Sequence, residues 1–249
     1  MNREAEGICL MNEDSIQEYL LDTLTDRASR IFGRQPSTAV ALQIDSLRER
    51  LREASKWVAE QRQAGWLPVE AEWKFHEHGE FAFGSMQIRG KIDLLEQNQK
   101  TGKYRVMDYK TADHAQDPRK AHLQKSPRRD AVIEEARFIG ADGKSWDWTD
   151  LQLPLYVLAT RQYYENICEA AYFNLPKAIG QTSIIAWRMD ESLLEHARSC
   201  AEAIATAIGN REFWPPAENV RFDVWTSWFP ENIRDRVDES WIIRNGGGA

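Results

Sequence analysis

Two aspartates and a lysine near the ends of two successive predicted strands constrain this chain more than any other feature. Asp93 lies in the run Lys91-Ile92-Asp93-Leu94-Leu95, and Asp108 lies near the end of the alternating run of residues 104–109, with a short polar turn between the two. Two such runs joined by a short turn predict neighbouring strands, which bring the carboxylates together. Lys110 follows two residues after Asp108, so both side chains point to one face of the strand.

These residue types in this arrangement indicate metal chemistry. Two carboxylates held close together repel each other unless a cation lies between them. Carboxylate oxygens and water suit Mg²⁺ or Mn²⁺, and Lys110 can orient an attacking water or stabilise charge on a phosphate. The pattern is therefore typical of metal-dependent phosphodiester cleavage. The spacing also allows a simpler interpretation, in which Lys110 is only the salt-bridge partner of Asp108.

A third segment, Gln152-Leu153-Pro154-Leu155-Tyr156, completes an ordered set with Gly90-Lys91-Ile92-Asp93 and Asp108-Tyr109-Lys110-Thr111. In these motifs the chain resembles the PD-(D/E)XK nuclease superfamily, and more closely its RecB/AddB-type exonuclease branch, from about residue 70 to residue 216. The resemblance implies that Asp93 and Asp108 bind the metal, with the Tyr109 carbonyl as an additional ligand. It also implies that Lys110 is catalytic and that Gln152 and Tyr156 complete the catalytic site on its DNA side.

The chain departs from that branch in two ways. Relatives carry a metal-binding histidine on a helix before the sheet, whereas no histidine precedes His76 here. Either such a helix lies upstream of residue 1, or an acidic residue substitutes, or the metal site is incomplete. Several relatives also carry four cysteines for an iron–sulfur cluster, but Cys9, Cys168 and Cys200 lack that spacing. We therefore expect Mg²⁺ or Mn²⁺ and no iron–sulfur cluster, and a tryptophan-rich C-terminal tail held by apolar packing.

The hydrophobic pattern predicts an α/β fold. Helical spacing over residues 12–32 and 37–64 is followed, after Gly65, by strand-like alternation and then by a helix over residues 149–164. We expect a restriction-endonuclease-like central mixed sheet flanked by helices, with an N-terminal helical extension. The expected division places the extension, packed on the core, at residues 1–65 and the nuclease core with its tail at residues 66–249.

The polar segment between Lys110 and the helix that carries Gln152 is expected to be a long loop, with a short strand or helix only near residues 131–139. The residues expected to contact DNA are Thr111, Arg119, Lys120, Lys125, Arg128, Arg129 and, by stacking on bases, Trp148. The alternative for the basic residues is a solvated loop with no ligand.

Composition limits the remaining choices. The 249 residues carry a net charge of −7, which argues mildly against non-specific nucleic-acid binding but allows a local basic patch. No apolar stretch reaches the length of a membrane span, and few cysteines favour a reducing cytoplasm. We expect a DNA nuclease of repair or recombination. Because the chain has no G-x-x-x-x-G-K-[ST] loop, we expect any helicase to be a separate subunit or domain. The alternative is a catalytically impaired nuclease fold that binds DNA or a helicase.

Overall fold

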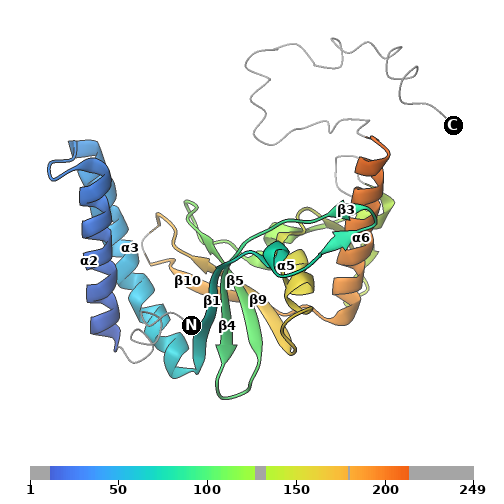
Figure 1. The fold of residues 1–249 in the computed structure, drawn as a ribbon, viewed down its shortest axis with the longest axis horizontal. Helices are drawn as coiled ribbons and strands as arrows, with labels where there is room; N and C mark the ends of the chain where they lie inside the picture. Colours follow the sequence, from blue (N-terminus) through green and yellow to red (C-terminus); the bar gives the residue numbers. More distant parts are fainter. Residues whose placement is uncertain (1–11, 127–132, 179, 213–249) are drawn as a thin grey trace, which may run out of the picture.

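A five-stranded mixed sheet forms the centre of the computed structural model, which describes residues 12–126, 133–178 and 180–212 (Figure 1). In spatial order its strands are β1 (Trp66–Trp73), β4 (Ile92–Asn98), β5 (Tyr104–Lys110), β9 (Ile167–Asn174) and β10 (Ser183–Trp187). Neighbouring strands are antiparallel except β5 and β9, which are parallel. A parallel pair requires a long crossover, and here that crossover includes the helix that carries Gln152.

Helices cover both faces of this sheet (Figure 1). The helices are α2 (Glu13–Phe32), α3 (Thr38–Gln63), α5 (Gln152–Thr160) and α6 (Glu191–Gly209). Ala54 of α3 packs with Met107 of β5, whereas Val106 of β5 belongs to the larger core that includes α5 and α6. Successive residues of β5 thus face opposite cores, because strand side chains alternate. The predicted α/β class, with a mixed sheet, flanking helices and N-terminal helices, is confirmed.

The segment between β5 and α5 is more ordered than predicted. It contains α4 (Pro118–His122), the 3₁₀ helix η2 (Glu134–Ala136) and the antiparallel strands β6 (Leu123–Lys125), β7 (Arg137–Ile139) and β8 (Ser145–Trp148), in the order β6-β8-β7. The prediction of a mostly irregular loop was therefore wrong. Strands of three or four residues bury one or two apolar side chains each, too few to produce a readable alternation.

Smaller elements complete the described chain. The 3₁₀ helix η1 (Phe75–Glu77) and the hairpin of β2 (Ala82–Phe83) and β3 (Met86–Gln87) lie between β1 and β4. Helix α5 begins three residues later and ends four residues earlier than its sequence pattern suggested. Among the described residues, no helix combines the length and the apolar character needed to cross a membrane.

A buried arginine joins four of the five central strands at the end of the sheet where β5 begins. Arg105 lies opposite Glu96 of β4 and Glu169 of β9 in the strand register. Its guanidinium is 2.7 Å from Glu96 and 3.9 Å from Glu169, and it covers the ring of Trp66 of β1 at 4.1 Å from the centroid. Burial raises the pKa of Glu96, while the charge of Arg105 opposes that shift. Arg105 thus compensates carboxylates that are costly to bury alone.

Replacing Arg105 with Leu should lower the free energy of unfolding by about 3–5 kcal/mol, because two buried carboxylates lose their partner. Urea unfolding at pH 7 measures this change. Arg30→Leu is the matched control, since Arg30 pairs with Asp26 on the surface of α2 and should change stability by no more than about 0.5 kcal/mol. Equal effects of the two substitutions would contradict the role given to Arg105.

Candidate active site

The candidate site lies where β4 begins and β5 ends. Leu94 pairs with Met107 in the antiparallel register, so Asp93 and Asp108 are the next residues outward on the two strands. The Asp93 carboxylate accepts a hydrogen bond of 2.9 Å from the backbone N–H of Tyr109. Asp93 is therefore held beside the D-x-K segment of β5 rather than directed away from the sheet.

Asp108 is the buried centre of this cluster, with 5% of its surface exposed. One carboxylate oxygen is 2.8 Å from the Lys110 ammonium, and the other accepts a 3.0 Å hydrogen bond from the side-chain amide of Gln152. Burial raises the pKa of Asp108 and the Asp93 charge raises it further, whereas Lys110 lowers it. A second positive charge at this position would relieve the repulsion between the two aspartates.

Gln152 connects the two charged groups of β5, Asp108 and Lys110, to helix α5. Its amide oxygen accepts a 3.3 Å hydrogen bond from Lys110, and its amide nitrogen also donates to the Tyr156 hydroxyl at 3.1 Å. Gln152 and Tyr156 share one helix face, as their spacing of four residues predicts. Burial raises the pKa of Tyr156, and the charges of Asp108 and Asp93 raise it further, so its hydroxyl stays protonated at neutral pH.

Gly90 leaves room for the aromatic side of the site. A Cβ atom at this position would lie 2.5 Å from the ring of Phe75 and 3.5 Å from that of Tyr156. The Gly90 carbonyl also lies 3.1 Å from Nδ1 of His76. The glycine three residues before Asp93 thus permits the close packing that holds the start of β4 against α5.

The donor set fits a divalent cation of the Mg²⁺ type. Mg²⁺ is commonly bound by one or two carboxylates and keeps several waters, and Asp93, Asp108 and the Tyr109 carbonyl are oxygen donors in neighbouring positions. Across residues 12–126, 133–178 and 180–212, no group of three or more His, Cys, Asp or Glu side chains is arranged to hold a metal ion. The described protein ligands would therefore leave most coordination positions to water and substrate.

The structure places the predicted DNA-contacting residues in different environments. Exposed positions are occupied by Thr111, Arg119, Lys120 and Lys125. The guanidinium of Arg119 lies 4.9 Å from the ring centroid of Trp146. Arg128, Arg129 and the tryptophans of the C-terminal tail lie outside the described residues.

Trp148 is not available for base stacking in this conformation. Its residue surface is 3% exposed, and its ring stacks on Phe138 with centroids 5.4 Å apart. The burial of Trp148 argues against the predicted contact with DNA, because both a free ring face and access from solvent are needed for stacking. The sequence pattern did not reveal this, since the small sheet that covers Trp148 was not predicted.

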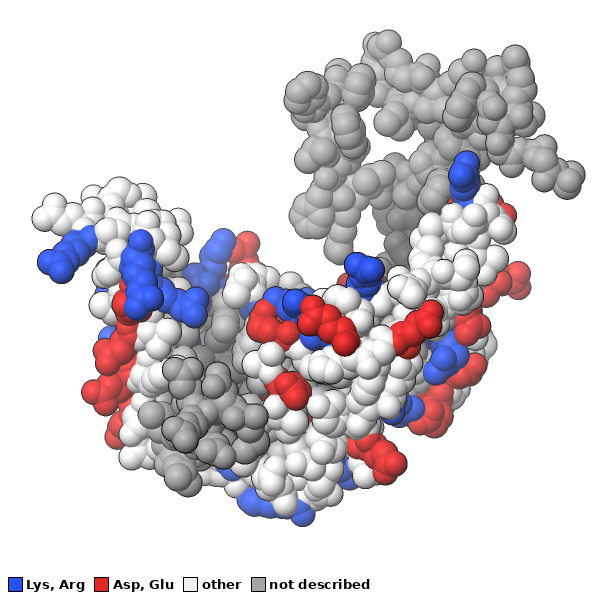
Figure 2. All heavy atoms as spheres, in the orientation of Figure 1, with Lys and Arg blue, Asp and Glu red and all other residues white. Residues whose placement is uncertain are grey.

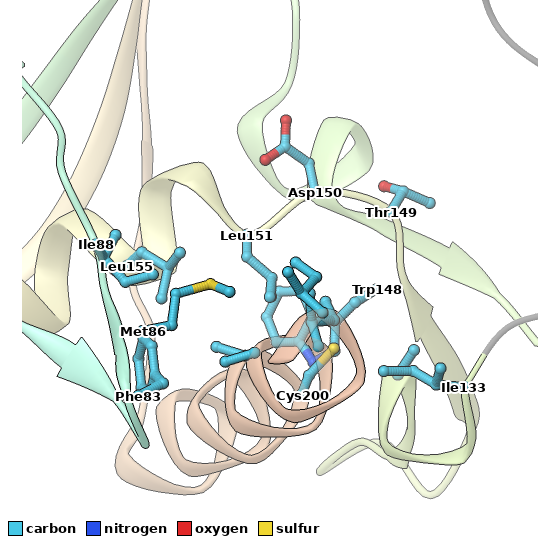
Figure 3. Close-up of a pocket in the computed structure, with 15 residues that line it drawn as sticks. Phe83, Met86, Ile88, Ile133, Trp148, Thr149, Asp150, Leu151, Leu155 and Cys200 are labelled. Atoms are coloured by element: carbon cyan, nitrogen blue, oxygen red, sulfur yellow. The ribbon is translucent and has the colours of Figure 1, made fainter. Parts of the chain in front are cut away.

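A separate pocket of about 530 Å³ lies behind the start of α5 (Figure 3). Its lining is mainly apolar and includes Met86, Leu151, Leu155, Trp148 and Cys200. In Figure 3 the Asp150 carboxylate points away from this lining. The pocket therefore lacks the grouped polar side chains that hydrolysis requires, and the candidate site remains the cluster around Asp108.

Sequence reasoning did not predict that two buried residues, His122 and Tyr172, support the site from behind. His122 and Tyr172 are 0% and 2% exposed, and both lie behind Lys110 and Gln152. His122 shows no ligand spacing, and Tyr172 reads as an ordinary strand residue. Only the parallel pairing of β5 with β9, which sets Tyr172 opposite Asp108, could have drawn attention to it.

Residues 9–241 match the family model of the PD-(D/E)XK nuclease superfamily, and the chain belongs to that superfamily. Its members are nucleases, metal-dependent phosphodiesterases that generally use ions such as Mg²⁺ or Mn²⁺. The fold implies DNA as the substrate. The matched range includes both N-terminal helices as well as the sheet. No curated protein matches the chain.

The buried His122 should make stability depend on pH. Burial lowers the pKa of His122, so the unfolded chain binds a proton more readily than the folded chain. The stabilisation is then present above the unfolded pKa of about 6.5 and is lost as pH falls below it. The free energy of unfolding should therefore fall between pH 7.5 and 5.5, because the unfolded chain takes up a proton there more readily than the folded chain.

Urea unfolding at a series of pH values checks this expectation. A His122→Gln variant should show a flatter loss of stability than the parent protein over that range. His114→Gln is the control, because His114 is exposed and its removal should leave the pH dependence of the parent unchanged. A His122→Gln profile parallel to that of the parent would contradict the assignment of His122 as a buried neutral group.

Proposed function

We propose that the protein is a Mg²⁺- or Mn²⁺-dependent deoxyribonuclease that acts on DNA ends or single strands in repair or recombination. The observation that supports this most is the convergence of Lys110 and Gln152 on the buried Asp108, with Asp93 on the adjacent strand. A simple salt bridge between Asp108 and Lys110 would not require a second carboxylate or an amide at the same place. Two carboxylates, an ammonium and an amide form a set suited to phosphodiester hydrolysis.

Asp93, Asp108 and the Tyr109 carbonyl would hold the metal. When bound, the ion supplies Lewis-acid polarisation of the phosphate and stabilises the charge that develops in the transition state. Lys110 places its ammonium beside Asp108, where it orients the attacking water and offsets negative charge on the phosphate. Because Lys110 is held by both Asp108 and Gln152, little reorganisation is needed during the reaction.

Gln152 and Tyr156 are proposed to shape the DNA side of the site. The amide of Gln152 fixes the orientations of Asp108 and Lys110 at once, through one donor and one acceptor. The protonated Tyr156 hydroxyl, which accepts from Gln152, retains a hydrogen that it can donate to a phosphate oxygen. Both residues thus contribute without changing their protonation state.

The RecB/AddB branch and a helicase partner remain parts of this proposal. They are supported by the ordered motifs around Asp93, Asp108 and Gln152 rather than by any contact in the structure. We also propose the division into a helical extension at residues 1–65 and a nuclease core at residues 66–249, which rests on the sequence pattern. In this proposal the cytoplasm is the site of action, where DNA and a helicase are both accessible.

A second function is a nuclease fold that binds DNA or a helicase without cleaving. It is favoured by the described metal donors, which comprise two carboxylates and no nearby third His, Cys, Asp or Glu side chain within the described ranges. Calorimetric titration with Mn²⁺ separates the two functions. A nuclease should bind Mn²⁺ clearly more tightly than an Asp93→Ala, Asp108→Ala double variant, whereas equal weak binding would favour the second function.

Replacing Lys110 with Ala should reduce cleavage of labelled DNA by at least about 100-fold, since the ammonium acts mainly in the transition state. Binding of DNA in EDTA should change little. Lys110→Arg should also fail, because a planar guanidinium does not replace a compact ammonium at a crowded site. Lys103→Ala is the control, as Lys103 is exposed immediately before the first residue of the same strand and should retain full activity.

Cleavage assays with single- and double-stranded DNA, in Mg²⁺, Mn²⁺ or EDTA, measure the effect of these Lys110 substitutions. Activity that survives EDTA or Lys110→Ala would remove the assignment of hydrolysis to this cluster. An RNA control strand decides whether the substrate is specifically DNA.

The exposed basic residues after β5 are proposed to contact DNA. The face in Figure 2 shows basic and acidic side chains mixed, with basic groups gathered at the upper end of the α2–α3 hairpin. In a protein of net charge −7, phosphate contacts must come from such local groups. Arg119, Lys120 and Lys125 are close in sequence to Lys110 and are exposed, so they are placed to guide a strand toward the site.

Changing Arg119, Lys120 and Lys125 together to Ala should weaken binding of single-stranded DNA and flatten its salt dependence. The slope of log K against log salt should fall by about 0.7 for each lost contact, or about 2 for all three. Fluorescence anisotropy in EDTA at several salt concentrations measures it. A control variant that changes Arg48, Arg52 and Lys56 of α3 to Ala removes the same amount of charge. If the slope of log K against log salt is the same in both variants, the proposed contact of Arg119, Lys120 and Lys125 with DNA is contradicted.

A further inference from the structure

Two buried polar residues lie directly behind the candidate site and have no part in the proposed hydrolysis. Tyr172 is on β9 and His122 ends α4, and their exposed fractions are 2% and 0%. Lys110 and Gln152 both bond to the Asp108 carboxylate, and each of the two buried residues lies against one of them or its immediate neighbour. Tyr172 contacts Lys110, and His122 contacts the first turn of α5 next to Gln152.

Tyr172 supports the ammonium of Lys110. The parallel register sets Tyr172 opposite Asp108, and the Lys110 nitrogen lies 4.7 Å from the centroid of the Tyr172 ring. A cation over an aromatic face is attracted by the negative potential of the ring. Lysine has a long flexible side chain, so this contact, together with Asp108 and Gln152, restricts where the ammonium can lie.

His122 supports the helix that presents Gln152. Its Nε2 accepts a 3.2 Å hydrogen bond from the backbone N–H of Leu153. A backbone N–H can only donate, so Nε2 carries no proton, and the ring is neutral with its hydrogen on Nδ1, 2.7 Å from the Pro118 carbonyl. The first N–H groups of a helix have no partner within the helix, and His122 satisfies one of them immediately beside Gln152.

The two supports also touch each other. The Tyr172 hydroxyl is 3.4 Å from Nδ1 of His122, at the outer limit of a hydrogen bond, and the ring centroids are 5.8 Å apart. Lys110 and Gln152 arrive on different elements, a strand and a helix, and yet are held from behind by one contiguous pair. A displacement of either ring would therefore alter the relative positions of Lys110 and Gln152.

We propose that Tyr172 and His122 are positioning residues of the nuclease centre: the Tyr172 ring orients the Lys110 ammonium, and His122 holds the α5 turn that carries Gln152. This inference rests on the proposed function for its effect on catalysis. The placement of the Lys110 ammonium by the Tyr172 ring does not depend on the proposed function, and it can be measured separately.

That measurement is the NMR signal of the Lys110 side chain in the full chain. Methylene protons next to the ammonium should show an upfield ring-current shift in the parent protein. Tyr172→Phe keeps the ring and should keep this shift, whereas Tyr172→Leu should move the signal to the value of an exposed lysine. Phe173→Leu is the matched control, because Phe173 is equally buried but faces the opposite core; it should leave the Lys110 signal unchanged.

Steady-state kinetics on DNA gives the catalytic readout. Tyr172→Leu should lower kcat by about 2- to 30-fold, the range of a cation–π contact, with KM nearly unchanged, and Tyr172→Phe should restore most of the rate. Phe173→Leu should lower thermal stability to a similar extent with kcat retained. His122→Leu removes the acceptor for Leu153 and should lower kcat about tenfold, while His122→Gln keeps a side-chain acceptor and should recover most of it.

The outcomes separate the inference from the proposed function. If the parent protein does not cleave DNA, the proposed function fails, and the Lys110 signal alone decides whether Tyr172 positions the ammonium. A Lys110 signal that is the same in the parent and in Tyr172→Leu overturns the inference. It is also overturned if Phe173→Leu and Tyr172→Leu lower kcat equally, since both effects would then reflect general loss of packing.

Discussion

Arg105 is the interaction on which the central sheet most depends. It bonds to Glu96 on one neighbouring strand, approaches Glu169 on the other and covers Trp66 on the edge strand. Each of these charges is costly to bury alone, so the group favours one alignment of β1, β4, β5 and β9 over any slipped alignment. At the opposite ends of β4 and β5, that same alignment brings Asp93 level with Asp108. The contacts of Arg105 at one end of the sheet thus fix the strand register that places Asp93 beside Asp108 at the other end.

The site results from a conflict between burial and charge on β5. Both faces of this strand are covered, which suits Val106 and Met107 but penalises the ionised form of Asp108. The fold offsets that penalty with an ammonium from the same strand and an amide from α5. A buried carboxylate that keeps a second carboxylate nearby is a common feature of sites that use a divalent cation, since the cation removes the remaining repulsion.

The segment after β5 is fixed to the site rather than independent of it. The buried side chain of Asn174 accepts from the N–H of Gln116 at 2.8 Å and donates to its carbonyl at 3.1 Å, clamping this segment to the end of β9. His122 then joins the end of α4 to the start of α5. Arg119 and Lys120 lie between these two anchors, so their backbone positions relative to Lys110 are set by the fold. Fixed backbone positions favour the proposal that these basic residues contact DNA over the alternative of a solvated loop with no ligand.

The sequence by itself determined the α/β class, the helix–sheet order and the grouping of Asp93, Asp108 and Lys110, because these follow from alternation and from the glycine stops. The addition of Gln152 and Tyr156 to that group came from the resemblance of the ordered motifs to a known family. Tertiary structure alone decided the burial of Trp148, the small sheet β6-β8-β7 and the placement of Tyr172 and His122 behind the site. Strands of three or four residues carry too little periodicity to be read, and a contact between residues fifty positions apart depends on which strands pair. Local patterns encode which face a side chain takes, whereas only the pairing of β5 with β9 decides what lies against that face.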